Sequence, residues 1–178
     1  MRAFIAIELP GPVQKQLSLL QAGIPLELGS VAPAKSFHLT LKFLGDISEE
    51  KAARVRELLA SVRHEPFEAA ISGTGFFPDG SRIRVVWAGA GPVSQFVALQ
   101  QKIEAVLHGL FPRDNEFVPH ITLARVRFLR DRQKFTEQVK EIRTGNLAFS
   151  VGSFSLKKST LSRDGPVYED IAVFPLVS

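Results

Sequence analysis

Hydrophobic and polar residues alternate along two short stretches of the chain, and each stretch predicts a β-strand. The first is Phe37-His38-Leu39-Thr40-Leu41, and the second is Pro119-His120-Ile121-Thr122-Leu123. Because successive side chains of a strand point to opposite faces, the histidine and threonine of each stretch share one face and the apolar residues occupy the other. Positions 38 and 120 are 82 residues apart, so each half of the chain carries one copy of the pattern.

The repeat extends to the elements around these strands. A predicted strand over residues 2–7 precedes Gly11-Pro12-Val13, and another over residues 82–87 precedes Gly91-Pro92-Val93. Apolar residues three or four positions apart then predict helices over residues 12–22 and 92–110, each with proline in its first turn, where the missing N–H does no harm. After each histidine stretch a second helix is predicted, capped by Ser48 or Asp131. Further strands are expected at residues 67–76, 147–156 and 168–174.

Each half therefore has the order β-α-β-α-β, which predicts an α+β fold. We expect a bilobal arrangement, in which two units related by a pseudo-twofold axis place antiparallel sheets on either side of a central cleft, with the helices outside. The whole chain, residues 1–178, is expected to form one domain, with the first motif around residues 37–45 and the second around residues 119–125. Such an axis would bring both histidines and both threonines to one site.

Composition limits the classes of function. The chain has 178 residues, 45% of them hydrophobic, which is enough for one normal core. No apolar run approaches the roughly 20 residues that span a bilayer, and the N-terminal residues do not resemble a secretory signal. The absence of cysteine excludes disulfides, thiolate zinc sites and cysteine nucleophiles. A cytoplasmic monomer that does not bind membranes is expected, and its net charge of +4 suits a polyanionic partner.

Two histidines and two threonines on one face suit displacement at phosphorus. One imidazole can accept a proton while the other donates one at neutral pH, and threonine hydroxyls can donate hydrogen bonds to phosphate oxygens. Four arginines follow the second motif, at positions 125, 127, 130 and 132, and either bind phosphate or face solvent. Strand alternation places Lys42 on the face of His38 and Thr40, where it either lines the cleft or is solvated.

Other kinds of site fit the sequence less well. Two histidines without a carboxylate cluster are too few ligands for zinc, and Glu116 is a weak candidate as a third, so neither a metal nor a cofactor is expected. No Gly-x-Ser-x-Gly elbow is present. Gly73-Thr74-Gly75 lacks the lysine of a P-loop and indicates a turn or bulge. His64 and His108 fall near predicted helix ends and are interpreted as structural.

The two motifs, residues 37–45 and 119–125, resemble the signatures of the 2H phosphoesterase superfamily, in particular the RNA 2′,3′-cyclic phosphodiesterases also called 2′-5′ RNA ligases. Residues 2–7, 159–161 and 165–168 also resemble that family. The resemblance implies hydrolysis of an RNA or nucleotide 2′,3′-cyclic phosphate to a 2′-phosphate without a metal, by His38 and His120, with Thr40 and Thr122 beside the phosphate. Two alternatives stay open: 2′-5′ RNA ligation as the physiological direction, and an RNA-end binding module without catalysis.

The resemblance also assigns phosphate contact to Arg125. Strict alternation contradicts this assignment, because it places Arg125 on the apolar face with Ile121 and Leu123. Either the strand ends or bulges near Ala124, or the guanidinium curls round the edge of the sheet. We take His38 as the acid and His120 as the base, an order that a near-symmetric pair of motifs does not fix.

Overall fold

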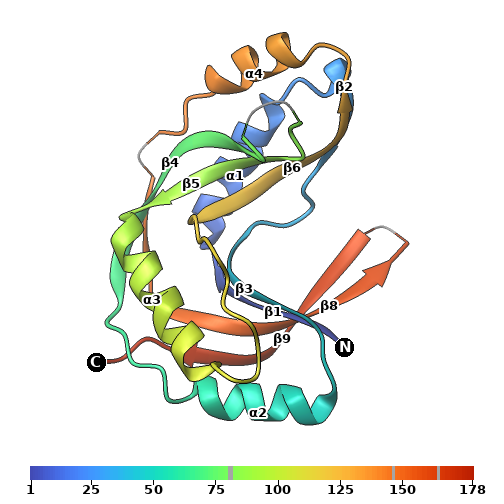
Figure 1. Ribbon diagram of the computed structural model, residues 1–178. Helices are drawn as coiled ribbons and strands as arrows, with labels where there is room; N and C mark the ends of the chain where they lie inside the picture. The colour runs from blue at the N-terminus through green and yellow to red at the C-terminus, as the bar shows by residue number, and fades with distance from the viewer. Residues whose placement is uncertain (80–81, 146, 164) are drawn as a thin grey trace.

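The computed structural model describes residues 1–79, 82–145, 147–163 and 165–178, which form an α+β fold (Figure 1). Within these residues the helices are α1 (Gly11–Ala22), α2 (Glu49–Leu59), α3 (Val93–Val106) and α4 (Arg132–Lys140), with a 3₁₀ turn at Leu26–Leu28. The strands are β1 (Arg2–Glu8), β2 (Gly29–Pro33), β3 (His38–Asp46), β4 (Phe67–Phe77), β5 (Val85–Gly91), β6 (His120–Leu129), β7 (Ala148–Val151), β8 (Ser153–Ser162) and β9 (Gly165–Pro175). No helix in the described ranges is long and apolar enough to cross a membrane.

The strands pair in the order β7-β4-β5-β6-β3-β1-β8-β9, and β2 pairs with β6. All of these pairs are antiparallel. The sheet curls into an open C, with α4 and β2 near one end and β8 and β9 near the other (Figure 1). The two motif strands, β3 and β6, lie next to each other in the middle of the strand order.

The α+β class and the antiparallel pairing are confirmed, but the strands of the two halves join one continuous sheet. Strand β4, from the first half, pairs with β5 and β7, whereas β8, from the second half, pairs with β1. The last strand of the first half, β4, therefore joins strands of the second half, while β8 and β9 of the second half join β1 of the first. The strand expected at residues 147–156 is divided at Gly152 into β7 and the start of β8, and the helix expected to reach residue 110 ends at Val106. Strand β2 was not predicted.

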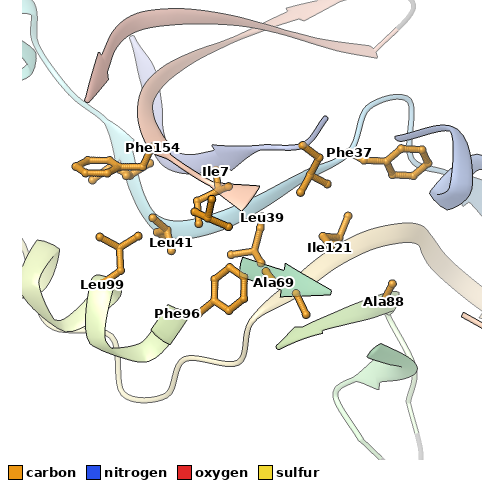
Figure 2. Packing of buried hydrophobic residues seen from close by; sticks show 14 of the residues in the cluster. Ile7, Phe37, Leu39, Leu41, Ala69, Ala88, Phe96, Leu99, Ile121 and Phe154 are labelled. Atoms are coloured by element: carbon orange, nitrogen blue, oxygen red, sulfur yellow. The ribbon is translucent and has the colours of Figure 1, made fainter. Parts of the chain in front are cut away.

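The apolar residues of the motif strands form part of the main core. Leu39 and Leu41 of β3 pack with Phe96 and Leu99 of α3, and Ile7, Ile121 and Phe154 lie around them (Figure 2). Leu39, Ile121, Phe96 and Leu99 have no exposed surface. Burying one such side chain contributes about 1.5–3 kcal/mol. The core therefore fixes one face of each motif strand and leaves the opposite face for the histidines.

The predicted helix caps are confirmed. The Ser48 hydroxyl accepts a hydrogen bond from the Lys51 amide at 3.1 Å, and Asp131 accepts one from the Lys134 amide at 2.9 Å. Each side chain satisfies a backbone N–H that the first helical turn leaves unpaired. These caps fix the starts of α2 and α4 directly after the two motif strands.

Candidate active site

The histidines and threonines of the two motifs come together where β3 meets β6. Leu39 lies opposite Ile121, and this pair joins the two antiparallel strands. His38 and Thr40 flank Leu39, and His120 and Thr122 flank Ile121, so all four side chains lie on the face opposite the core. Thr40 is buried and the other three are half-buried. The positions match the pseudo-symmetric site that the sequence predicts.

A β-bulge interrupts each motif strand one residue after its threonine. In the first, Thr40 pairs with Ala6 and Lys42 with Ile5, so Leu41 is passed over. In the second, Thr122 pairs with Trp87 and Ala124 with Val86, so Leu123 is passed over. An extra residue reverses the alternation of faces beyond it.

The bulges decide where the two candidate cations point. Arg125 is exposed and turns to the histidine face, while the preceding Ala124 is fully buried. The bulge near Ala124, one of the expected alternatives, thus resolves the conflict for Arg125. In the first motif, Phe43 takes the position equivalent to Arg125 and is 67% exposed.

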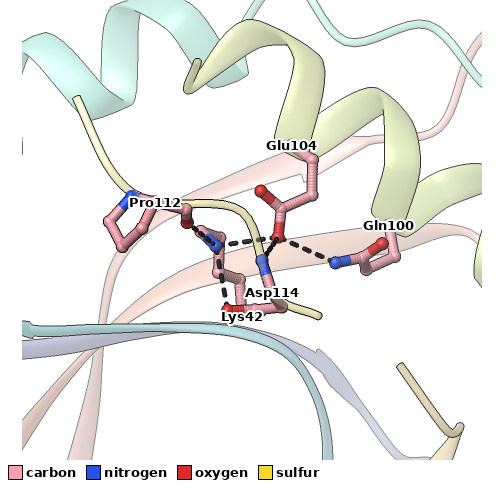
Figure 3. Close-up of polar contacts among 5 residues, drawn as sticks. All are labelled: Lys42, Gln100, Glu104, Pro112 and Asp114. Carbon is pink, nitrogen blue, oxygen red and sulfur yellow. Dashed lines mark hydrogen bonds and ion pairs between the residues drawn. The ribbon is translucent and has the colours of Figure 1, made fainter. Parts of the chain in front are cut away.

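Lys42 borders a cavity beside Thr40 and His120, but the strand face that alternation predicted for it is wrong. The bulge at Leu41 turns Lys42 to the core face, where it is 2% exposed and pairs with Ile5. Its ammonium forms an ion pair with Glu104 of α3 at 2.7 Å (Figure 3). Lys42 is therefore not solvated, and its ammonium is held by Glu104 at the border of the cavity.

The His120 ring has a defined orientation. Its Nδ1 lies 2.8 Å from the Val118 carbonyl oxygen, which can only accept, so Nδ1 carries the proton. When the ring is neutral, Nε2 is then the free acceptor. Phe77 packs edge-on against the ring with centroids 4.8 Å apart, and Trp87 lies at 6.3 Å. The Val118 carbonyl and these two aromatic rings hold the imidazole in one orientation.

Aromatic rings also enclose His38. Its centroid is 5.0 Å from that of Phe4 and 5.0 Å from that of Tyr168, which meets it edge-on. The sequence resemblance covers Tyr168 without giving it a role. Tyr168 reaches His38 only because β9 pairs with β8 beside β1, a long-range arrangement that no local pattern shows.

A buried cation lies near His38 and was also missed from sequence. Lys157 of β8 forms ion pairs with Glu8 at 2.7 Å and Asp170 at 2.8 Å. Burial by itself would lower the pKa of the Lys157 ammonium, but hydrogen bonds to Asp170 and Glu8 outweigh it and raise this pKa. Lys157 is therefore a cation at neutral pH and acts electrostatically on His38.

The pKa values of both histidines are lowered. Burial, followed by the charges of Lys157, Arg125 and His120, lowers the pKa of His38 to about 4. Burial and Arg125 lower the pKa of His120, against the Val118 carbonyl, which raises it. Both rings are consequently neutral at pH 7 in the free protein. Arg125 acts on both histidines, so its charge lies close to both motifs.

A cavity of about 530 Å³ adjoins Thr40 and His120. Three aromatic side chains line it, together with the segment that precedes β6: Phe43, Phe77, Phe117 and residues 113–118. Its position beside the motif residues suits a ligand that extends from a phosphate held at the histidines. A separate hollow of about 560 Å³ between α2 and the end of β9 contains no histidine.

The remaining candidates lie away from this cluster or have structural roles. His64 is buried, with Nδ1 2.7 Å from the Glu65 carbonyl oxygen, and His108 is exposed after α3. Gly73 sits at a register shift in β4, which confirms the expected bulge. Among the residues that the structure describes, no three histidine or acidic side chains are grouped so that they could hold a metal ion.

Comparison with known proteins agrees with this geometry. The profile of the family described as "LigT like Phosphoesterase" matches residues 7–87 and 91–168, which correspond to the two halves of the repeat. The RNA 2′,3′-cyclic phosphodiesterase of Methanothermobacter thermautotrophicus is 35% identical over 184 residues, covering 99% of each chain.

Solved structures show the same fold. The crystal structure of TT0787 of Thermus thermophilus has a TM-score of 0.84 at 31% identity and covers 99% of this chain and 98% of that one. Escherichia coli LigT, crystallised with 3′-AMP, has a TM-score of 0.77 at 26% identity, with 99% and 98% coverage. The chain therefore belongs to the LigT-like phosphoesterase family.

Proposed function

We propose that this protein hydrolyses the 2′,3′-cyclic phosphate of an RNA end or a nucleotide to a 2′-phosphate, with His38 and His120 as acid and base and without a metal. The observation that carries the proposal is the presence of two His-x-Thr pairs on one face of one sheet, next to an arginine that a bulge turns to the same face. The name of the Methanothermobacter relative, RNA 2′,3′-cyclic phosphodiesterase, supports this substrate class.

The reaction is an in-line displacement at phosphorus. One imidazole takes a proton from water as the water oxygen bonds to phosphorus, and the bond from phosphorus to the 3′ oxygen breaks. The other imidazole gives its proton to the departing 3′ oxygen, which becomes a hydroxyl. The phosphate remains on the 2′ oxygen. Opposed positions for the two imidazoles, one on each motif strand, suit this geometry.

Three side chains stabilise the negative charge that develops on the phosphoryl oxygens. The hydroxyls of Thr40 and Thr122 donate hydrogen bonds to the non-bridging oxygens, one from each motif. The Arg125 guanidinium adds a full positive charge to one side only. This cation breaks the symmetry of the site, so it orients the cyclic phosphate and determines which ribose oxygen leaves.

The order of acid and base depends on the bound phosphate. In the free protein the pKa of His38 is about 4, too low for an acid at neutral pH. The phosphate of the substrate is an anion, and an anion raises the pKa of an adjacent imidazole. With His38 as the acid, substrate binding must supply this rise. His120 is suited to be the base, because its Nδ1 proton is held by Val118 and Nε2 is free to accept.

Single histidine variants test the proposal. His38→Ala and His120→Ala should each reduce turnover of a 2′,3′-cyclic nucleotide by about two orders of magnitude or more, the usual effect of losing a positioned acid or base. Arg127→Ala, a surface change on β6, is the matched control and should retain activity. Near-normal turnover in either histidine variant would overturn the paired mechanism.

A further inference from the structure

A buried polar network joins β3, α3 and the segment before β6, next to the cavity of the candidate site (Figure 3). The Lys42 ammonium donates to Glu104 Oε1 at 2.7 Å and to the Pro112 carbonyl oxygen at 2.9 Å, and forms an ion pair with Asp114 at 3.2 Å. Glu104 Oε1 also accepts from Gln100 Nε2 at 2.9 Å and from the Asp114 amide at 3.2 Å. The side chains of Lys42 and Glu104 are 1% and 4% exposed.

The network connects the two catalytic motifs. Lys42 lies on β3, two residues after Thr40, while Pro112 and Asp114 belong to the segment that leads from α3 to His120. That segment ends with the Val118 carbonyl, which fixes Nδ1 of His120. Residues 113–118 also form a wall of the 530 Å³ cavity. The contacts therefore tie the strand of one motif to the backbone that orients the histidine of the other.

Stability alone does not explain a buried ion pair here. Desolvation of two charges offsets much of their attraction, and well-packed apolar side chains of similar volume often stabilise a protein equally well. An apolar pair, however, could hold neither the Pro112 carbonyl nor the Asp114 amide by hydrogen bonds. The geometry of the segment before His120 is what the charged pair specifies.

We propose that Lys42 and Glu104 are positioning residues: they hold the segment 112–118 so that the Val118 carbonyl keeps His120 in its proton-transfer orientation. The effect on catalysis rests on the proposed function, but the effect on His120 does not. A displacement of an acid or base by about 1 Å can reduce the rate a hundredfold. A loosened segment should therefore reduce turnover at least tenfold, although neither Lys42 nor Glu104 takes part in proton transfer.

The test uses the double variant Lys42→Met/Glu104→Leu, which replaces the ion pair by apolar side chains and leaves no unpaired buried charge between them. Turnover of 2′,3′-cyclic AMP is measured together with the NMR signal of the His120 Nδ1 proton, assigned by its absence in His120→Gln. Val139→Ala, a core truncation in α4, serves as the control for lost stability, and Lys102→Met as the control for a lysine lost near the network. Glu104→Gln, which retains the shape and an acceptor oxygen, is the milder second variant.

The double variant should fold, lose the slowly exchanging Nδ1 proton signal and turn over at least tenfold more slowly, while both controls keep signal and rate. Glu104→Gln should show the same changes to a smaller degree, and it decides the question if the double variant does not fold. A retained signal, with or without a slower rate, would overturn the proposed positioning, as would a lost signal with normal turnover. If the unaltered protein does not hydrolyse cyclic phosphate, the proposed function fails, and the proton signal still decides whether the network orients His120.

Discussion

Replacing His38 by glutamine should make the folded protein less sensitive to acid. The pKa of His38 is lowered to about 4, first by burial and then by nearby cations, whereas an unfolded histidine titrates near 6.5. The neutral ring is therefore favoured in the folded state. Its contribution to stability is complete above the unfolded value and is lost as the pH falls from 6.5 towards 4. At pH 5 this loss amounts to about 2 kcal/mol of the free energy of unfolding.

The free energy of unfolding is measured with urea at pH 8 and pH 5 for both proteins. Between these two conditions His38→Gln should lose about 2 kcal/mol less stability than the unaltered protein. Other titrating groups contribute to both proteins and cancel in the comparison. An identical loss in both would show that His38 titrates normally, and that Lys157 and Arg125 do not act on it as the structure indicates.

Three further predictions concern the phosphate site and the fold. Arg125→Ala should lower kcat/KM at least tenfold, about 1.4 kcal/mol of transition-state stabilisation, and an equal effect of Arg127→Ala would remove the special role of Arg125. The rate profile should be bell-shaped. Its alkaline limb, where the acid loses its proton, should lie at higher pH in kcat than in kcat/KM, because bound phosphate raises the pKa of His38. Coincident alkaline limbs would contradict His38 as the acid, and a rise through about pH 9 would indicate another nucleophile. Asp131→Ala should lower the free energy of unfolding by about 1 kcal/mol through loss of the α4 cap, and an unchanged urea midpoint would contradict this.

The local parts of the fold could be predicted because short-range rules determine them. Alternation identified β3 and β6, and a polar residue before an amphipathic stretch identified the caps of α2 and α4. Strand β2, residues 29–33, has no such alternation. Its pairing with β6 arises from tertiary packing, which local propensity does not show.

Strand alternation predicted the faces of the side chains as far as the threonine of each motif. Beyond each threonine it predicted the wrong face. A bulge inserts one residue without any local signature, since Leu41 and Leu123 resemble any other core residues. One bulge turns Lys42 away from the histidine face, and the other turns Arg125 towards it. For Arg125, the family resemblance indicated the histidine face, whereas strand alternation alone indicated the apolar face.

Long-range pairing accounts for the functional candidates that the sequence missed. Tyr168 and Lys157 lie on β9 and β8, strands that the second half contributes to the sheet beside β1 and β3. Each half of the repeat suggests closure on itself, because neighbouring elements usually pair. The exchange of strands between halves brings these residues to His38, and only the three-dimensional arrangement reveals it.

Paired histidines should open a cyclic phosphate without a metal and leave the phosphate on the 2′ oxygen. The most direct measurement incubates the purified protein with 2′,3′-cyclic AMP in excess EDTA and identifies the product by phosphorus NMR against 2′-AMP and 3′-AMP standards. We expect sustained turnover to 2′-AMP alone. Formation of 3′-AMP, or turnover that appears only when a divalent metal is restored, would contradict it.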